Sequence, residues 1–325
     1  MSAPNPAGDD PRRLDGQCAL VTGGTDGIGL HTATGLARLG ARVIVTGRDP
    51  LRGARAVNQI QARVGHDRVE FVQVDHLTVG ANQHLAGQLA GLVNRLDVLV
   101  NNVGRVFPAR QETPDGYEAT LALCFLGPYT LTEAAMPLLT SRPGARIVNL
   151  NSSAYKMWRH DPFEDVDSER DYIGIQAHAH AKLLNLIWTF ALAERLREHQ
   201  VAVNAINPGA AWTPGTAQLT PQAVPAWRYV WPIVRFLQRR GSPAKAAEHP
   251  LWLITSTGSL DLTGSYLEGR KVKRPNVATD ADHQRRVLDL AADLVARAAT
   301  ATKPHEHIRR REPRRPDRPS HGEPA

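Results

Sequence analysis

The sequence predicts an α/β protein with a doubly wound, mainly parallel sheet of seven strands and helices on both faces. Short apolar runs alternate along the chain with longer amphipathic segments, which is the order that βαβ units produce. The first apolar run ends in a glycine-rich turn that continues directly as an amphipathic helix over residues 20–38. A strand that ends in such a turn exposes backbone N–H groups at the positive end of a helix dipole. This arrangement favours the phosphates of a nucleotide as the ligand.

The turn itself has the spacing Thr22-Gly23-x-x-x-Gly27-x-Gly29. Glycine lets a diphosphate approach the backbone closely, because it has no side chain to keep the ligand away. The spacing differs from the Gly-x-Gly-x-x-Gly fingerprint of many dinucleotide domains, and the turn lacks the Gly-Lys-Ser/Thr ending of a P-loop. A purely conformational role for the glycines is the alternative reading of this motif.

The remaining elements follow from short apolar runs and from longer segments with helical periodicity. The expected strands cover residues 16–21, 41–46, 69–74, 96–100, 146–150, 201–206 and 264–267. The expected helices cover residues 27–39, 51–64, 115–140, 174–198, 243–256 and 280–299, with one more beginning near Thr78. Residues 154–172 are expected to be irregular.

The chain length indicates one large domain with tails. With 325 residues, of which 42% are hydrophobic and 22% charged, the chain can bury the core of one large α/β domain. We expect this domain over 14–298, with disordered segments at 1–13 and 299–325, the latter basic and rich in Pro and Arg. Residues 214–242 carry Pro, Trp and long apolar side chains. They suit a substrate lid, or a helix pair facing a membrane or an oligomer partner.

The charge and the cysteines exclude several classes of protein. The net charge is +7, and residues 299–325 contribute seven Lys or Arg against four Asp or Glu, so the domain is only mildly basic and no specific nucleic-acid partner is expected. Cys18 and Cys124 are too far apart in sequence to indicate a disulfide framework or a metal site. No signal peptide or transmembrane span is recognisable. We therefore expect a cytoplasmic protein. The protein could also form a homo-oligomer.

Two polar positions follow predicted strands, at the edge where open α/β sheets bind ligands. Arg48 comes just after the second strand, where an Arg favours the 2′-phosphate of NADP and an acid favours the 2′-hydroxyl of NAD. Because the acid Asp49 is next in the sequence, NAD remains a possible cofactor. Arg48 could alternatively be an ordinary loop residue in contact with solvent. Asp75 follows the third strand and either meets the ligand or caps the helix beginning near Thr78.

Further motifs follow the glycine turn in a fixed order. They are Asn101-Asn102-Val103-Gly104, Ser152, Lys182 and Pro208-Gly209-x-x-x-Thr213. With these motifs the chain resembles the short-chain dehydrogenase/reductase family over about residues 14–298. Stretches such as 146–154 and 182–185 resemble its retinol-dehydrogenase-like branch. The resemblance implies a single Rossmann-type domain that binds NADP(H), with NAD(H) left open.

The resemblance also implies which residues meet the cofactor. In the family the acid after the third strand contacts the adenine ring, the Lys holds the nicotinamide ribose, and the last Thr meets the nicotinamide amide. The residues expected to bind the cofactor are Thr22, Gly23, Thr25, Gly27, Ile28, Gly29, Arg48, Asp75, Asn102, Gly104, Lys182, Pro208, Gly209 and Thr213.

The catalytic positions depart from the family pattern. Family catalysis rests on Asn, Ser, Tyr and Lys, with Tyr and Lys four residues apart on one helix face. Here Ser152 and Lys182 are in place, but His178 stands where the Tyr is expected and Cys124 where the Asn is expected. We take these residues as the catalytic candidates, without any metal.

The two replacements change the acid–base chemistry. The pKa of an unperturbed imidazole is near 6.5, and a neighbouring Lys182 lowers it, so His178 should be mostly neutral at pH 7. An imidazole also reaches less far than a phenol, so contact with a substrate needs a shift or a bridging water. Cys124 offers only a weak thiol donor. Tyr155, His160 and Tyr172 lie near the expected substrate entrance, and they and His180 are expected to be surface or packing residues.

These residues support three hypotheses. The first is an NADP(H)-dependent oxidoreductase acting on a carbonyl or alcohol of a small hydrophobic molecule, with Ser152 on the substrate oxygen and His178 relaying the proton. The second is a redox-neutral isomerisation, elimination or cyclisation with His178 as the base. The third is a catalytically silent nucleotide-binding protein. The Ala-, Arg- and Pro-rich composition is typical of high-GC bacterial genes. Divergent members of the family from such genes resemble tailoring enzymes, so the resemblance implies a role in secondary metabolism.

Overall fold

The computed structural model describes residues 11–209, 211, 241–259 and 261–301, which contain an eight-stranded sheet. The strand order is β3-β2-β1-β4-β5-β6-β7-β8. All neighbours are parallel except β7 and β8, which are antiparallel. The strands are β1 (Cys18–Val21), β2 (Arg42–Gly47), β3 (Val69–Gln73), β4 (Val98–Asn101), β5 (Arg146–Leu150), β6 (Ala202–Asn207), β7 (Ser265–Glu268) and β8 (Lys271–Lys273).

The seven expected strands are all present, and β8 is additional. This strand has three exposed residues, two of them lysines, and it follows a turn in which Gly269 has a φ angle of 62°. It contains no apolar run that a periodicity argument could detect. A short lysine-bearing strand at a sheet edge discourages pairing with other chains, which is a sufficient physical reason for its composition.

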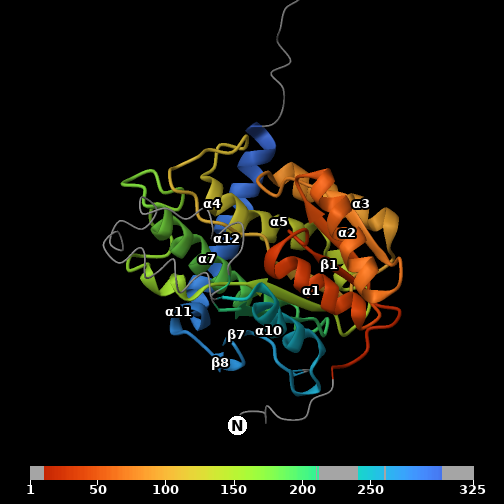
Figure 1. Cartoon of the computed structure of the whole chain (residues 1–325). Helices are drawn as coiled ribbons and strands as arrows, with labels where there is room; N and C mark the ends of the chain where they lie inside the picture. Colours follow the sequence, from red (N-terminus) through yellow and green to blue (C-terminus); the bar gives the residue numbers. More distant parts are fainter. Residues whose placement is uncertain (1–10, 210, 212–240, 260, 302–325) are drawn as a thin grey trace, which may run out of the picture.

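Helices cover both faces of the sheet (Figure 1). The long helices are α1 (Gly27–Arg38), α2 (Pro50–Val64), α3 (Val79–Leu92), α5 (Gly127–Ala134), α7 (Gly174–Arg195), α10 (Pro243–Thr255) and α12 (Ala281–Ala301). The short ones are α4 (Ala119–Leu121), η1 (Ala122–Leu126), α6 (Met136–Leu139), η2 (Ser153–Met157), η5 (Thr257–Ser259) and α11 (Asn276–Thr279). Helix α1 packs against α2 and α10 on one face, while α3, α5, α7 and α12 pack together on the other.

The two faces of the sheet bury two separate hydrophobic cores. Successive strand residues point to opposite faces, so Leu20 of β1 enters one core while Ala19 and Val21 enter the other. The core under α3, α5, α7 and α12 contains the fully buried Trp188, and the core under α1, α2 and α10 contains Leu36. This two-sided burial explains why the strands are continuous apolar runs without alternation.

The helix expected over residues 115–140 is wrong in its details. The helical segment begins at Ala119, capped by the Glu118 carboxylate, which accepts the N–H of Leu121 at 2.8 Å. Asp115 lies outside it and accepts the N–H of Val79 at 2.6 Å, at the start of α3. The segment also contains the π-helical turn η1 and a break at Ala135 between α5 and α6. Helix propensities do not predict such interruptions, because tertiary contacts cause them.

The ends of the domain extend slightly beyond the expected bounds of 14–298. The backbone N–H of Arg12 donates to the carbonyl of Thr255 at 2.9 Å, and Arg13 pairs with Asp15 at 2.8 Å. At the other end, α12 continues to Ala301. Most of the expected lid (214–242), residues 1–10 of the expected N-terminal tail and 302–325 of the C-terminal tail lie outside the described residues.

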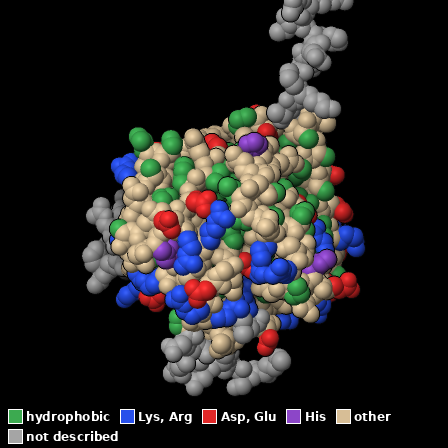
Figure 2. Space-filling view, turned by 90° about the vertical axis from the view of Figure 1, so that its right-hand side faces the viewer, with side chains coloured by type: hydrophobic (Ala, Val, Ile, Leu, Met, Phe, Trp, Pro, Cys, Tyr) green, Lys and Arg blue, Asp and Glu red, His purple; other side chains and the backbone are tan. Residues whose placement is uncertain are grey.

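The described surface is mixed in charge. Figure 2 shows Lys and Arg side chains interspersed with Asp and Glu on one face of the molecule. At the amino edge of the sheet, Arg42 pairs with Glu70 and Arg95 pairs with Asp97, so part of the positive charge is balanced locally. None of the described helices is long and apolar enough to cross a lipid bilayer.

Candidate active site

The glycine turn after β1 is held tightly against the start of α1. Gly23 and Gly27 have φ angles of 62° and 54°, in the left-handed region that favours glycine. Gly29 cannot carry a side chain, because a Cβ atom there would lie 2.5 Å from the carbonyl oxygen of Gly23. Asp26 caps α1 by accepting the N–H of Gly27 at 2.6 Å. The turn therefore packs tightly against the start of α1, and its lack of side chains leaves the backbone accessible to a phosphate group.

Asn102 ties this turn to the loop after β4. Its Nδ2 donates to the carbonyl oxygens of Thr22 at 2.7 Å and Gly23 at 3.3 Å. In return, the hydroxyl of Thr22 accepts the backbone N–H of Asn102 at 2.9 Å. Strands β1 and β4 are neighbours at the point where the strand order reverses, which is where open α/β sheets bind ligands.

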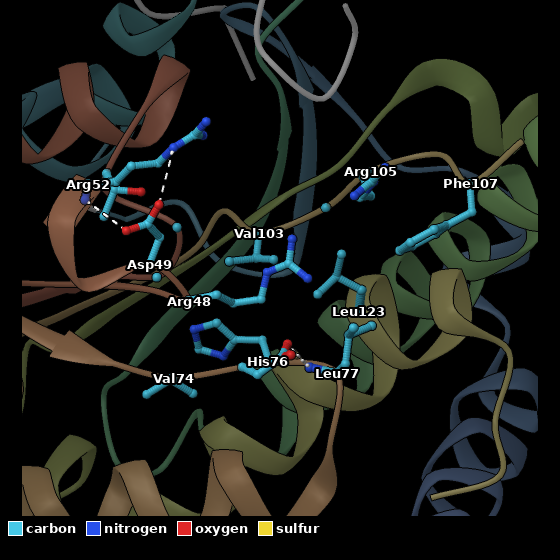
Figure 3. A pocket seen from close by; sticks show the side chains of 15 residues that line it. Arg48, Asp49, Arg52, Val74, His76, Leu77, Val103, Arg105, Phe107 and Leu123 are labelled. Carbon is cyan, nitrogen blue, oxygen red and sulfur yellow. Dashed lines mark hydrogen bonds and ion pairs between the residues drawn. The ribbon is translucent and has the colours of Figure 1, made fainter. Parts of the chain in front are cut away.

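A cavity of about 580 Å³ opens beside the turn, at the carboxyl ends of β1 to β4 (Figure 3). It is lined by Gly23, Thr25, Gly47, Arg48, Asp49, Arg52, Val74, Asp75, His76, Leu77, Val103, Gly104, Arg105, Phe107 and Leu123. A smaller cavity of about 250 Å³ adjoins it along the start of α1, where Gly27, Ile28, Gly29 and Asn102 contribute to the lining. Together the two cavities bring most of the expected cofactor-binding residues to one crevice.

Arg48 points into the larger cavity, whereas Asp49 is engaged elsewhere (Figure 3). The backbone of Arg48 is held by Gln73, whose Nε2 donates to its carbonyl at 3.0 Å. Asp49 is the N-cap of α2 and accepts the N–H groups of Leu51 at 2.9 Å and Arg52 at 3.1 Å. This geometry favours Arg48 over Asp49 as the group that meets a ligand, because the cap already uses the carboxylate.

Asp75 lines the cavity and does not cap α3. The cap is Thr78, whose hydroxyl accepts the N–H of Ala81 at 3.3 Å, with Asp115 accepting the N–H of Val79. Asp75 instead accepts the N–H of Leu77 at 3.2 Å and is exposed at the cavity. The capping alternative for Asp75 is therefore wrong.

His76 is a residue of this site that the sequence analysis missed. Its Nε2 lies 2.7 Å from the hydroxyl of Thr46, and its Nδ1 lies 2.7 Å from Oδ1 of Asn82. Because that Asn oxygen only accepts, Nδ1 carries the proton and Thr46 donates to Nε2. The Thr46 oxygen in turn accepts the N–H of Gly23 at 3.3 Å. This chain of hydrogen bonds connects the glycine turn to α3. The sequence could not predict this role of His76, because a single histidine after a strand forms no recognisable pattern.

Lys182, His178 and Cys124 come together next to Gly104. Lys182 Nζ donates to the carbonyl of Leu150 at 2.7 Å, and Cys124 Sγ lies 3.9 Å from His178 Nδ1. A Cβ atom on Gly104 would lie 3.4 Å from both Cys124 Sγ and Lys182 Nζ. The catalytic candidates from α7 and η1 thus meet at the loop that also lines the two cavities.

Two asparagines that were not predicted position these groups. Asn151 Nδ2 donates to the carbonyl of Lys182 at 3.0 Å, and its Oδ1 accepts the N–H of Ser152 at 2.7 Å. Asn185 Nδ2 donates to the carbonyl of Cys124 at 3.1 Å. The hydroxyl oxygen of Ser152 accepts the N–H of Ala154 at 3.2 Å, which leaves its proton available to another acceptor.

Burial determines the protonation of the three groups. Burial, and then the charge of Lys182, lower the pKa of His178 to about 3, so the imidazole is neutral near pH 7 as expected. Burial raises the pKa of Cys124 and keeps the thiol protonated. Burial also lowers the pKa of Lys182. The arrangement offers a neutral base, a weak thiol donor and an amine that donates to a carbonyl.

The other titratable candidates have packing partners. The Tyr172 hydroxyl donates to the Phe107 carbonyl and lies 3.1 Å from the Glu118 carboxylate, and burial raises its pKa. Tyr155 packs edge-on against Tyr266. His180 stacks on Trp158 with ring centroids 3.9 Å apart and is buried, and the ring of His160 also contacts Trp158.

The loop after β6 is only partly described. Gly209 has a φ angle of 84°, and its N–H donates to Oδ1 of Asn207 at 3.0 Å. The carbonyl of Pro208 lies 3.1 Å from Nδ1 of His249. Thr213 lies outside the described residues.

The fold and these cavities define a doubly wound α/β protein with a ligand crevice at its topological switch point. A family model described as short chain dehydrogenase matches residues 17–162. Mouse retinol dehydrogenase 11 is 30% identical over 254 residues, which are 78% of this chain and 78% of the mouse protein. Over 79% of this chain and 95% of the other, a Pseudomonas aeruginosa RhlG/NADP complex is 28% identical with a TM-score of 0.59.

A third relative is a 3-oxoacyl (acyl-carrier-protein) reductase from Agrobacterium tumefaciens C58 with NADP bound. It is 25% identical, covers 79% of this chain and 95% of its own, and has a TM-score of 0.62. The chain belongs to the short-chain dehydrogenase/reductase family, and it is distantly related to the retinol dehydrogenases.

Proposed function

We propose that this protein binds NADP(H) in the crevice and interconverts an alcohol and a carbonyl group of a small hydrophobic molecule. The observation that carries the proposal is the position of Arg48, which enters the larger cavity from the end of β2 beside the glycine turn (Figure 3). A guanidinium there suits a 2′-phosphate, and a short acidic side chain does not. The family relation and the NADP-bound relatives support the same assignment.

The residues of the crevice fit such a cofactor. A Cβ atom at Gly23 or Gly29 would lie within 3 Å of a neighbouring backbone or side-chain atom, so both positions require glycine. Without side chains there, phosphates can approach the backbone of the turn. When bound, NADP(H) supplies or accepts a hydride at its nicotinamide ring. Lys182 Nζ uses one donor on the Leu150 carbonyl and has others for the nicotinamide ribose.

The acid–base chemistry falls to Ser152 and His178 in this proposal. The Ser152 hydroxyl has a free proton to donate to a substrate oxygen, because its oxygen already accepts the Ala154 N–H. His178 is neutral, so it can take the proton of an alcohol directly or through one water. Cys124 Sγ lies 3.9 Å from Nδ1, and the Arg105 backbone also hydrogen-bonds the imidazole.

A redox-neutral reaction with His178 as the base is the second candidate. At pH 7 His178 carries no proton to give to a carbonyl oxygen, so in this site it can act only as a base, and its low pKa makes it a weak one. In that case a bound nucleotide would stay unconsumed during turnover. A role in bacterial secondary metabolism rests on composition and on the chain's divergence from the family pattern, and it stays a prediction.

The test is turnover of aldehydes with NADPH. Purified protein is mixed with NADPH and a panel of retinal and straight-chain aldehydes, and the loss of NADPH is followed together with the alcohol formed. The proposal expects stoichiometric consumption that Lys182→Met abolishes, with Lys156→Met, an exposed lysine, as the control. Conversion of substrate without NADPH loss would support the redox-neutral candidate and contradict the first.

A further inference from the structure

We infer that Arg105 is a second arginine that binds a phosphate group of the nucleotide, opposite Arg48. The inference rests on the proposed function, since it assigns a further binding residue in the same crevice. Arg105 directly follows Gly104 in the loop after β4, and it lines the cavity of about 580 Å³ together with Arg48 and Arg52. Figure 3 shows Arg48 and Arg105 on different sides of the cavity, because they come from the ends of β2 and β4.

The cavity lining carries three arginines, Arg48, Arg52 and Arg105, and two carboxylates, Asp49 and Asp75, so its net charge is positive. Arg52 Nε lies 3.6 Å from Asp49, and that carboxylate also caps α2. Asp75 accepts the N–H of Leu77. Burial, and then the charge of Arg48, lower the pKa of Arg105, so the two guanidinium groups repel one another across the cavity. An anion between them would remove this repulsion.

The guanidinium of Arg105 is held in place by an aromatic platform. Its central carbon lies 4.5 Å from the centroid of the Phe107 ring. The Phe107 carbonyl accepts the Tyr172 hydroxyl at 3.1 Å, and a Cβ on Gly174 would lie 2.1 Å from that carbonyl oxygen. The start of α7 therefore packs against the platform and fixes it. A preorganised guanidinium binds a phosphate with less loss of side-chain entropy.

The backbone of Arg105 is also fixed, on the side of the catalytic candidates. Its carbonyl accepts the thiol of Cys124 at 3.9 Å, next to His178. The side chain can thus reach the cavity while the main chain stays packed against η1. A guanidinium at this point pairs with phosphate oxygens through two parallel N–H groups. The phosphate can be the 2′-phosphate or the diphosphate, and different ligands separate these sources.

The experiment compares nucleotide affinities of Arg105→Gln with those of the unaltered protein by calorimetric titration. The ligands are NADP⁺, NAD⁺, adenosine 2′,5′-bisphosphate and ADP. We expect Arg105→Gln to weaken NADP⁺ binding about tenfold or more, the range for a hydrogen bond to a charged group. Weakened bisphosphate binding with unchanged NAD⁺ and ADP binding assigns Arg105 to the 2′-phosphate. An equal loss for NADP⁺, NAD⁺ and ADP assigns it to the diphosphate.

Arg55→Gln is the matched control. Arg55 is exposed on α2, donates to the Leu51 carbonyl at 3.2 Å and does not line the cavity, so its removal changes the net charge equally. Arg105→Lys keeps the positive charge but loses the paired N–H groups of the guanidinium. Its affinity for NADP⁺ should lie between those of Arg105→Gln and Arg55→Gln. Phe107→Leu should weaken binding about two- to fivefold by releasing the guanidinium. Unfolding temperatures without nucleotide verify that each variant is folded.

Two outcomes would overturn the inference in distinguishable ways. If the unaltered protein binds NADP⁺ and Arg105→Gln binds every ligand as Arg55→Gln does, Arg105 contacts no phosphate and the proposed function stands. If the unaltered protein binds none of the four nucleotides, the proposed function fails and the inference fails with it.

Discussion

At the scale of single residues, the proposed function makes His178 the group that accepts the substrate proton. Its pKa of about 3 means that the imidazole stays neutral between about pH 5 and pH 8, because it takes up a proton only below that range. We therefore expect any turnover that uses His178 as a base to show no loss from this group across that interval. His178→Ala should lower turnover by about 10²-fold or more.

The informative companion variant is His178→Tyr. A phenol next to Lys182 is a base only when ionised, so its pH profile should rise toward alkaline pH, while the profile of the unaltered protein is flat. Measuring kcat against pH for both proteins separates the two side chains. Full turnover in His178→Ala on the same substrate would show that the proton is carried elsewhere.

His76 is expected to stabilise the fold through its two buried hydrogen bonds. His76→Leu leaves the Thr46 hydroxyl and the Asn82 oxygen without their partner, and both are buried. The free energy of unfolding should fall by about 1–3 kcal/mol, the usual cost of such groups. Urea unfolding measures the difference, with His84→Leu, at an exposed position of α3, as the control. Equal stability of the two variants would show that the bonds contribute nothing.

At the scale of elements, the close contact between the glycine turn and the loop after β4 makes a sharp prediction. A Cβ on Gly29 would lie 2.6 Å from Nδ2 of Asn102, so Gly29→Ala should push the two loops apart and abolish nucleotide binding. Gly80→Ala on α3 meets nothing within 4 Å and should be neutral or stabilise by up to about 1 kcal/mol. Titration with NADPH measures both variants. Normal binding by Gly29→Ala would mean that the turn is not the phosphate site.

The same elements show what the sequence can and cannot reveal. The strand ends and the glycine turn were predictable, because apolar runs and glycines report local backbone demands directly. The π-helical turn around Cys124 was not, since the Asn185 amide that binds its carbonyl comes from a distant part of the chain. Asn151 was likewise missed, because its role is to connect Ser152 with Lys182. Such positioning bonds depend on tertiary structure and leave no spacing pattern.

At the scale of the whole molecule, histidines with lowered pKa values make stability depend on pH. Burial lowers the pKa of His76, His178 and His180, while the unfolded chain binds protons near pH 6.5. Below about pH 6.5 the unfolded state therefore holds more protons than the folded state, so stability falls as the pH drops toward the lowered values.

This dependence is measured by urea unfolding at about pH 7.5 and pH 5.5. His180→Phe keeps an aromatic ring beside Trp158 and removes one titrating group, so its stability should fall less between the two pH values. An identical fall in both proteins would show that His180 is protonated equally in the folded and unfolded states.

The proposed function requires the crevice to bind NADP(H) and Arg48 to favour it over NAD(H). The most direct test is calorimetric titration of the unaltered protein and of Arg48→Ala with NADPH and NADH. We predict tighter binding of NADPH than of NADH, and a loss of about 1.5–3 kcal/mol of NADPH binding free energy in Arg48→Ala with NADH unchanged. Equal affinities of the unaltered protein for the two nucleotides, or no effect of Arg48→Ala on NADPH, would contradict the account.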